Sequence, residues 1–491
     1  MEEAALAGGG DGESGRSEAA ALWVAVVLFA GLSLACAVLS EGFVAADACT
    51  HYLYAKYAFV EPLNWVDVWA RPVVTALYAV PARFGGRLAV RIVSMLVAVG
   101  CGLVGLGIAR GQGMRRPGLA LIFTLGQPLL FLHSFGEMTE LPFALLAGGA
   151  FWAYQGRRWL VMAALAALLP ATRPEGFAFI AFAAVALVLH RRWWWLVVLP
   201  LPLLAWDIAG WELTREPGPW WRWLIDAWPY SADSMYGRGS VFTFVATLPV
   251  VVGPAVLPPM LIGLWRGLQE PVRDRALDPH LRRCRFLTAV IPLFVLVSHS
   301  LLWRLGKMSS FGEPRYLLVV APVWGVLSAR GWEWVWTRFR WGRPLRWAGL
   351  AALAPVVANL VHPVVPVRLS DDWRAAKRFA AWYQSTPAHT RYPRVLASHP
   401  GVFYFLGASP TGESRGGGFS RSLIAACPAG TILIWDPKYS GLNATPDQTT
   451  TLAAIRAAGW VEDMEAEAAV NRAQAEEKRQ WHIYHSALAA Q

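Results

Sequence analysis

Two carboxylates and an imidazole lie close together at the edge of an apolar stretch. If the segment is helical, His133, Glu137 and Glu140 fall on one stripe of the helix and point the same way. Together they could bind a divalent cation or a substrate hydroxyl. Acids so near a membrane core are costly and indicate function. The alternative is a helix end whose acids are solvated.

Two further groups contain arginine. Residues 172–176 read Thr-Arg-Pro-Glu-Gly and predict a tight turn between two short apolar segments. In that turn Arg173 either serves a substrate or simply pairs with Glu175. Residues 311–316 precede a late apolar segment and place Arg315 near the level of the lipid headgroups. A guanidinium there can bind a phosphate through two parallel hydrogen bonds, or it can merely anchor the chain at the interface.

A fourth group lies in a long loop, residues 40–87, directly after the first apolar segment. Residues 47–59 are compatible with an amphipathic helix, in which Asp47 and His51 share one face because they are four residues apart. Residues 66–82 predict a second interfacial helix with an Arg-Pro pair inside it. These segments could equally be two helices that only lie on the membrane.

The elements that must position these groups are membrane spans. The chain has 491 residues, of which 56% are hydrophobic and 16% charged, and its mean hydropathy is +0.38. Soluble proteins average about 45–50% apolar and about 25% charged residues. The apolar runs approach the roughly 17–25 residues that a span needs. They predict a polytopic α-helical membrane protein with about eleven spans, at residues 20–39, 88–109, 119–132, 141–155, 159–171, 176–189, 193–210, 241–264, 286–302, 316–329 and 347–365.

The basic residues predict which side each loop occupies. The net charge is +11, and arginine pairs at 115–116, 157–158, 191–192 and 282–283 all fall on one predicted side. Cytosolic loops carry such an excess, so the charge does not indicate nucleic-acid binding. With the N-terminus inside, the four candidate groups lie outside, as does the C-terminal region.

The C-terminal region predicts a small extracytoplasmic α/β domain over residues 366–491. Residues 371–383 have helical periodicity, and residues 394–398 and 431–436 are short buried strands by pattern. A helix is expected over 449–458 and a last strand over 481–484. Helices and strands therefore alternate, as is typical of an α/β domain. The chain therefore divides into an N-terminal tail at 1–19, a transmembrane domain at 20–365 that includes the long loop, and this domain.

The absence of nucleotide-binding motifs limits the kinds of donor that the protein is expected to use. The sequence has no GxxxxGK[ST] loop, no GxGxxG after a strand and no Asp-x-Asp pair. The chain is therefore not expected to use ATP or a nucleotide sugar. A transfer on the external face needs an activated donor that is itself in the membrane.

Taken together, these residues resemble the C-type glycosyltransferase superfamily (GT-C). Its members are polytopic and use polyprenyl-phosphate sugars; they include protein O-mannosyltransferases and lipid A aminoarabinose transferases. The likeness covers most of residues 20–330 in layout. It rests on Asp47 in the first external loop, the Glu137/Glu140 stretch, the turn at 172–176 and the motif Glu313-Pro314-Arg315-Tyr316. Ala48 follows Asp47 where many members have a second acid, and Phe311-Gly312 replace a His-Lys pair.

The resemblance implies an inverting transfer from a polyprenyl-phosphate sugar, such as mannose, to a hydroxyl of a glycan, lipid or protein. It implies that Asp47 is the general base and that Arg315, then Arg173 and Arg71, stabilise the leaving phosphate. It also implies a bacterial plasma membrane location. The residues that it implies in substrate binding are His51, Arg71, Glu137, Glu140, Arg173, Glu175, Glu313, Arg315 and Tyr316.

Two other functions fit the sequence less well. A secondary transporter would be expected to place ionisable residues at mid-membrane, often with repeat symmetry, and only Asp207 lies deep in a predicted span. A non-catalytic component of a glycan or polymer assembly system would instead bind a partner through the C-terminal domain.

Overall fold

The computed structural model describes residues 10–215, 217–229, 233–234, 236–273, 275–339, 361, 363–411, 421–440, 452–472 and 480–487. The chain forms two compact units. The helical unit comprises Met1–Leu39, Leu88–Trp228 and Arg238–Pro366, and the sheet unit comprises Ser40–Arg87, Pro229–Gly237 and Val367–Gln491. The long loop after the first helix thus belongs to the same unit as the C-terminal region, whereas the sequence suggested that it belongs to the transmembrane domain.

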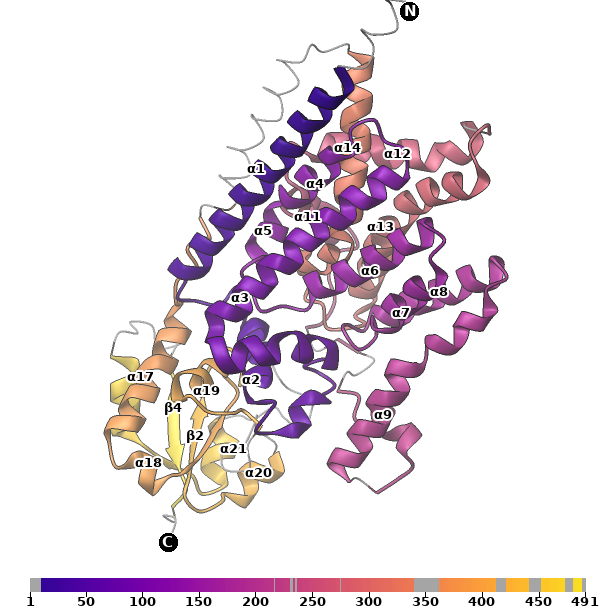
Figure 1. Ribbon diagram of the computed structural model, residues 1–491. Coiled ribbons are helices and arrows are strands. Elements are labelled where there is room, and N and C mark those ends of the chain that lie inside the picture. The colour runs from indigo at the N-terminus through magenta and orange to yellow at the C-terminus, as the bar shows by residue number, and fades with distance from the viewer. Residues whose placement is uncertain are drawn as a thin grey trace, which may run out of the picture. The chain divides into compact units, whose positions relative to one another are not determined.

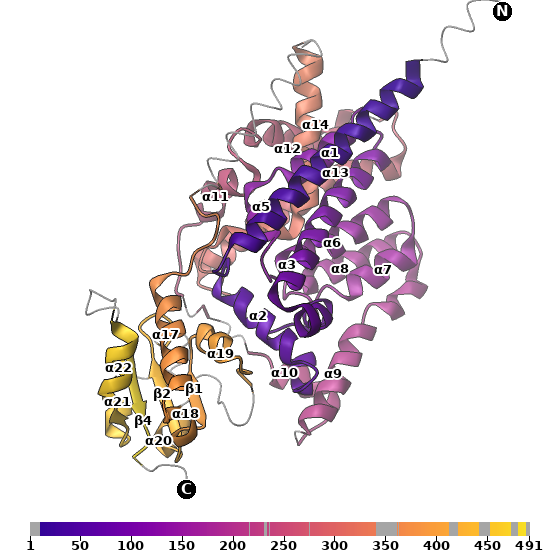
Figure 2. The same cartoon turned by 60° about the vertical axis from the view of Figure 1, so that its left-hand side comes forward.

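The helical unit consists of apolar helices joined by short turns (Figures 1 and 2). Helices α6, α7 and α8 contact one another in succession, and α1 runs along α4. In chain order its elements are α1 (Gly10–Leu39), the later part of α3 (Pro72–Gly111), α4 (Gly118–Leu125), α5 (Pro128–His133), α6 (Glu140–Gln155), α7 (Trp159–Ala167), α8 (Gly176–Leu189), η2 (Trp193–Val198), α9 (Leu201–Thr214), η3 (Trp220–Arg222), α10 (Trp223–Asp226), α11 (Thr243–Val252), α12 (Leu257–Arg273), α13 (Pro279–Leu305), η4 (Pro314–Val320) and α14 (Ala321–Arg338).

Four of the described helical segments are long and apolar enough to cross a membrane. They are Ala19–Leu39, Pro72–Gly111, Trp193–Thr214 and Pro279–Leu305. Helices α11 and α12 make a fifth if the pair, which is bent by 113°, counts as one span. These helices indicate an integral membrane protein. The expected eleven spans remain a prediction, since several correspond to shorter helices and the last, at 347–365, falls largely outside the described residues.

Proline and glycine explain where the helices depart from the expected spans. The expected span at 119–132 is two helices, α4 and α5, because Pro128 begins a new helix after Gln127, which has an extended backbone. Helix α3 is broken at Gly86, whose φ of 64° and ψ of −158° are not helical. The second expected interfacial helix, at 66–82, starts only at Pro72, because proline is accommodated in the first turn of a helix.

The sheet unit contains α2 (Ala46–Tyr57), η1 (Pro62–Trp65) and the start of α3 from the long loop. Its C-terminal part has the sheet order β1-β2-β4-β3, in which β1 and β2 are parallel and β4 is antiparallel to both β2 and β3. The further elements are α17 (Asp371–Ser385), α18 (Ala388–Arg391), β1 (Arg394–Ala397), α19 (Pro400–Leu406), α20 (Arg421–Ala426), β2 (Thr431–Trp435), α21 (Leu452–Ala457), β3 (Val461–Glu462), α22 (Met464–Asn471) and β4 (His482–His485).

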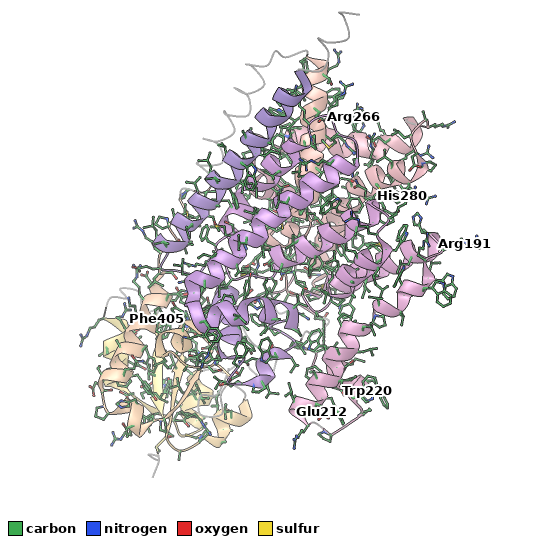
Figure 3. The ribbon with its side chains drawn as sticks, in the orientation of Figure 1. Arg191, Glu212, Trp220, Arg266, His280 and Phe405 are labelled. Carbon is green, nitrogen blue, oxygen red and sulfur yellow. The ribbon has the colours of Figure 1, made fainter. Side chains whose placement is uncertain are left out.

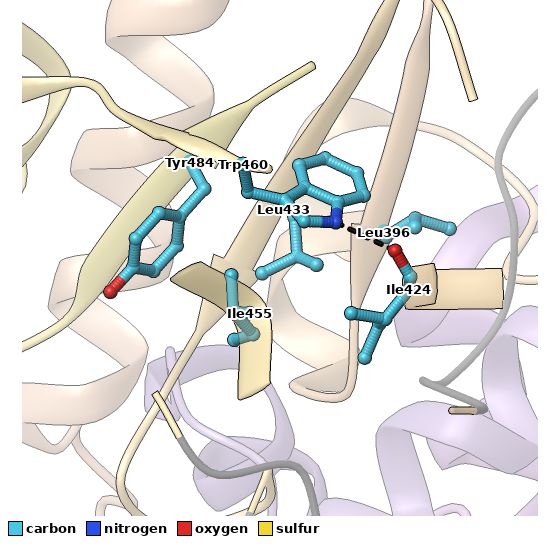
Figure 4. Packing of buried hydrophobic residues seen from close by; sticks show 6 residues of the cluster. All are labelled: Leu396, Ile424, Leu433, Ile455, Trp460 and Tyr484. Atoms are coloured by element: carbon cyan, nitrogen blue, oxygen red, sulfur yellow. Dashed lines mark hydrogen bonds between the residues drawn. The ribbon is translucent and has the colours of Figure 1, made fainter. Parts of the chain in front are cut away.

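Side chains that face one side of the sheet form its hydrophobic core, because successive residues of a strand point to opposite sides. Leu396 lies beside Leu433 on the neighbouring strand, and Tyr484 pairs with Leu433 from the other side, so all three face one way. Helices α20 and α21 cover this face through Ile424 and Ile455 (Figure 4). Trp460 closes the cluster, and its indole Nε1 donates to the carbonyl oxygen of Ile424 at 2.9 Å. The short buried strands predicted from the sequence are therefore confirmed.

The start of α17 carries a polar cluster that ties the sheet to its helices. The Asp372 carboxylate accepts a hydrogen bond from Lys438 Nζ at 2.8 Å and lies 3.5 Å from His399 Nε2. Burial alone raises the pKa of Asp372, but hydrogen bonds from His399, Lys438 and Ser370 outweigh burial and lower this pKa below its ordinary value. The ionised form of Asp372 therefore stabilises the folded unit.

The long loop packs against the C-terminal part of this unit. The Phe43 ring lies 5.1 Å from the Trp373 ring of α17, and Cys49 Sγ lies 3.8 Å from the carbonyl oxygen of Pro400. The Glu61 carboxylate accepts hydrogen bonds from the hydroxyl groups of Ser409 and Thr411. Loop 40–87 is therefore an integral part of the sheet unit.

Candidate active site

Residues from three separate turns of the helical unit meet in one buried ionic network. Glu140 starts α6, Arg173 and Glu175 lie in the turn between α7 and α8, and Glu313 and Arg315 lie at the start of η4. These residues are far apart in the sequence, and tertiary packing joins them. The network thus unites five of the ten side chains predicted as site residues from the sequence.

Arg173 is at the centre of the network. Its Nη1 donates to Glu140 Oε1 at 2.8 Å and to Thr139 Oγ1 at 2.5 Å, and its Nη2 donates to Glu175 Oε1 at 3.0 Å. Burial alone lowers the pKa of Arg173 and raises that of Glu175, but their mutual attraction outweighs burial, so the pKa of Arg173 is raised and that of Glu175 is lowered. Both groups are therefore ionised at neutral pH.

The turn that presents Arg173 requires its glycine. A Cβ atom at Gly176 would collide with the carbonyl group of Leu169 and the nitrogen of Pro170. The chain therefore reverses tightly enough to begin α8 directly after Glu175. The sequence left open whether Arg173 pairs with Glu175 or serves a substrate. The structure shows the pair with Glu175 and a second pair with Glu140.

Arg315 is less enclosed than Arg173. It forms an ion pair with Glu313, and its Nε lies 3.7 Å from Glu140 Oε1. The Arg315 side chain is 14% exposed and the Glu313 side chain is 39% exposed, so this pair lies at the open side of the network. The Tyr316 ring lies 5.0 Å from the Arg173 guanidinium and 5.8 Å from that of Arg315.

Two histidines lie beside the ionic network. His299 Nε2 lies 3.7 Å from Glu175 Oε1, and the His299 ring lies 5.1 Å from the Tyr316 ring. His133 is buried at the end of α5. Within the described chain, His133 Nδ1 and the second carboxylate oxygen of Glu140 are buried without a hydrogen-bond partner. Because such groups are costly to leave unpaired, this is a place where a water molecule or a polar group of a ligand can bind.

The expectation of a single helical stripe through His133, Glu137 and Glu140 is wrong. His133 ends α5 and Glu140 begins α6, because Pro142 is compatible only with the first turn of a helix. Glu137, in the intervening turn, is fully buried and pairs with Arg91 on α3 at 3.3 Å. Arg91 was not among the residues predicted from the sequence, although an arginine within an apolar span is itself a functional signal.

The other predicted site residues lie in the sheet unit. Asp47 is in the first turn of α2 and half-buried. His51 is buried, and its ring stacks on that of Trp69 with centroids 4.6 Å apart. Arg71 is almost fully buried and has a left-handed backbone with φ of 71°. The helix that was expected to place Asp47 and His51 on one face is confirmed, whereas their approach to Arg315 remains a prediction.

The acids of the network do not fit a divalent cation. Among the residues that the structure describes, no three His, Cys, Asp or Glu side chains are grouped to hold a metal ion. Glu140, Glu175 and Glu313 each face a guanidinium instead. The arrangement is suited to organise polar groups of a substrate and, at Arg315, to bind an anion.

Comparison with known proteins identifies the fold. No protein-family model matches the chain. No curated protein matches its sequence. Among solved structures it is similar to ArnT from Cupriavidus metallidurans bound to undecaprenyl phosphate, with a TM-score of 0.61 and 15% sequence identity over 96% of this chain and 99% of that chain.

Two further structures agree with this result. The apo state of ArnT gives a TM-score of 0.56 and 16% identity over 95% of this chain and 98% of that chain. The oligosaccharyltransferase from Archaeoglobus fulgidus gives a TM-score of 0.52 and 11% identity over 85% of this chain and 70% of that chain. The chain therefore has the GT-C fold that its short motifs led us to expect.

Proposed function

We propose that this GT-C-fold chain is an integral membrane glycosyltransferase that moves a sugar from a polyprenyl-phosphate donor to an acceptor hydroxyl on the extracytoplasmic face. One observation carries the proposal: the buried Glu140–Arg173–Glu175 network adjoins a partly exposed guanidinium, that of Arg315. The similarity to ArnT, which binds undecaprenyl phosphate, supports this assignment.

Arg315 is the group that we assign to the donor phosphate. Its present partner, Glu313, is the most exposed acid of the network, so a phosphate can replace that carboxylate at low cost. The phosphate gains negative charge as the sugar leaves. A fixed guanidinium at this point stabilises the transition state more than the ground state. Arg315 therefore lowers the barrier to transfer.

Arg173 acts as a positioning residue. Its guanidinium is occupied by Glu140, Glu175 and Thr139, which leaves little capacity for a phosphate. It instead fixes the Glu140 side chain, whose second oxygen is buried without a partner within the described chain. That oxygen would accept a hydrogen bond from a hydroxyl of the donor sugar, with His133 beside it.

Asp47 is our general base. Its carboxylate takes the proton of the acceptor hydroxyl while the acceptor oxygen attacks the anomeric carbon. The bond between that carbon and the phosphate oxygen breaks, and the polyprenyl phosphate leaves with the electron pair. The anomeric carbon is inverted in this single displacement. His51 and Arg71, from the same loop, would line the acceptor side, and Glu137 would hold its neighbouring turn through Arg91.

The remaining assignments concern the sugar, the acceptor and the membrane. We assign mannose as the first donor sugar to test and a bacterial plasma membrane as the location. The domain at 366–491 would lie outside the cell and contact a glycan, lipid or protein acceptor. Its packing against loop 40–87 supports this role, because the same loop carries Asp47.

The experiment is turnover of polyprenyl-phosphate sugars by the purified chain in lipid nanodiscs. We expect Asp47→Asn to lower the rate by about 10²–10⁴-fold and Arg315→Gln by about 10²–10³-fold. Matched controls are Glu41→Gln, an exposed acid of the same loop, and Arg304→Gln, an exposed arginine at the end of α13. Near-normal turnover by the Asp47 or Arg315 variant would remove that residue from the mechanism. Uptake of a solute into proteoliposomes without a lipid-linked donor would instead support a transporter.

A further inference from the structure

A second polar cluster lies at the other end of the helices that carry the ionic network. Helix α6 begins at Glu140 and has 16 residues, so its two ends are about 24 Å apart. Helix α13 connects the same two ends, because His280 Nε2 lies 3.1 Å from the Gln155 carbonyl oxygen at the end of α6, whereas His299 contacts Glu175. The second cluster is therefore separate from the proposed active site.

This end of the unit has a cavity that is open to the surface. It is lined by Arg157, Trp159, His190 and Arg192 and has a volume of about 420 Å³. Its lining includes two guanidinium groups and an imidazole but no carboxylate. The cavity is large enough for a phosphate group and its substituents, and its charge favours an anion.

Two similar turns place the arginines. After α6, Arg157 adopts a left-handed backbone with φ of 55°, and Arg158 N donates back to the Ala153 carbonyl at 2.8 Å. After α8, Arg191 adopts φ of 57°, and Arg192 N donates to the Leu187 carbonyl at 2.8 Å. Helix ends of this kind usually use glycine at the left-handed position. Here both turns have arginine at that position.

The cations at the cavity are weakly neutralised. Arg157 Nη2 lies 3.8 Å from Asp278 Oδ2, and both side chains are more than half exposed. Within the described chain, the Arg192 guanidinium has no hydrogen-bond or ion-pair partner. The Tyr154 hydroxyl lies 3.3 Å from His190 Nε2 and so orients the imidazole, whose ring lines the cavity.

Exposed tryptophans surround this end of the unit. Trp152 is in the last turns of α6, and Trp193 and Trp194 follow Arg192 with their rings stacked at 3.7 Å; all three are exposed. Tryptophan gathers at this density where a protein meets lipid headgroups. In Figure 3, His280 and Arg191 lie toward one end of the unit, whereas Glu212 and Trp220 lie toward the other.

We propose that this cavity binds a phosphate-bearing anion, either the headgroup of an anionic lipid or free inorganic phosphate. The guanidinium groups of Arg157 and Arg192 would each donate hydrogen bonds to the phosphate oxygens, a geometry that guanidinium matches well. By the expected topology these turns face the cytosol, so the site is on the opposite side from sugar transfer. The inference does not depend on the proposed function.

The test compares two double variants that remove equal charge from the same two turns. Arg157→Gln/Arg192→Gln changes the cavity, whereas Arg158→Gln/Arg191→Gln changes exposed arginines outside its lining. Each double variant alters one left-handed position, so backbone effects are matched. One arm measures phosphatidylglycerol retained by the purified full chain in native mass spectrometry. The other arm titrates inorganic phosphate and follows the thermal unfolding midpoint.

We expect the cavity variant to bind at least about tenfold more weakly than the control variant. Loss in the phosphatidylglycerol arm alone supports a lipid headgroup as the ligand. Loss in the inorganic phosphate arm supports free phosphate. Equal binding by both double variants in both arms overturns the proposal. If the cavity variant is misfolded, Arg192→Gln alone decides between these outcomes, because its side chain has no partner within the described chain to lose.

Discussion

Replacement of Arg173 by glutamine is the most informative change to the ionic network. The substitution keeps a side chain of similar length but removes the charge that faces Glu140 and Glu175. Both acids are largely enclosed, with side-chain exposures of 1% and 10%. The Arg173→Gln variant therefore leaves two carboxylates in a poorly solvated site without their central counter-charge.

The size of the effect follows from this enclosure. Removing one partner of a buried ion pair typically costs about 3–5 kcal/mol, because the remaining charge stays desolvated. Arg315, whose Nε lies 3.7 Å from Glu140 Oε1, offsets only a small part of this cost, because it also pairs with Glu313. We therefore expect a loss of about 3–5 kcal/mol in the free energy of unfolding.

The chain offers a matched exposed pair as a control. Arg222 Nη2 lies 3.1 Å from Asp226 Oδ1, a distance close to that of the Arg173–Glu175 pair, but both side chains are about half exposed or more. Arg222→Gln should cost less than about 1 kcal/mol, because exposed pairs are well screened. Denaturant unfolding in detergent micelles, followed by circular dichroism, measures both variants under one set of conditions.

A further variant tests the cause of the loss. Glu140→Gln and Glu175→Gln added to Arg173→Gln remove the stranded charges and should recover part of the stability. If Arg173→Gln costs no more than Arg222→Gln, the network does not stabilise this unit and our reading of its buried charges is refuted. If the triple variant is less stable than Arg173→Gln alone, stranded charge is not the cause.

Three further substitutions test a second buried ion pair, a tight turn and a carboxylate of the sheet unit. Arg91→Met should destabilise the helical unit, and adding Glu137→Leu should restore part of the loss, since both charges are then replaced by apolar groups; denaturant unfolding checks this. Gly176→Ala should cost about 1–3 kcal/mol through its collision with the Leu169 carbonyl; an unchanged unfolding midpoint would contradict it. The lowered pKa of Asp372 adds stability above its unfolded pKa of about 3.9, and this is lost as the pH falls through the folded pKa. Asp372→Asn should therefore weaken the sheet unit at pH 7. The difference from the unchanged protein should shrink as the pH falls below about 3.9 and vanish only below the folded pKa, as measured by hydrogen exchange corrected for intrinsic rates.

The strands and helices of the C-terminal part were predictable because their signals are local. The buried runs at 394–398 and 431–436 differ by only one residue from strands β1 and β2. The predicted helix at 371–383 differs from α17 by two residues at its end. Short apolar runs flanked by turns and a clear 3.6-residue period are sufficient for such elements.

The candidate site was predictable in its residue types but not in its pairings. Glu140, Arg173 and Arg315 could be predicted because they are charged residues at the ends of apolar helices. Only the packing of α6, α8 and η4 shows that the three meet. The expected stripe through residues 133, 137 and 140 was wrong because it assumed one continuous helical period, whereas a turn separates α5 from α6. Arg91 was missed because it lies inside a run that was interpreted only by its hydropathy.

A cryo-electron microscopy map of the full chain in nanodiscs with bound polyprenyl phosphate would locate the phosphate relative to Asp47 and Arg315. We predict density for the phosphate within hydrogen-bond distance of the Arg315 guanidinium, with the Asp47 carboxylate opening into the same cavity on the extracytoplasmic side. A phosphate bound elsewhere, or Asp47 and Arg315 on opposite faces of the membrane, would contradict the proposed glycosyltransferase mechanism.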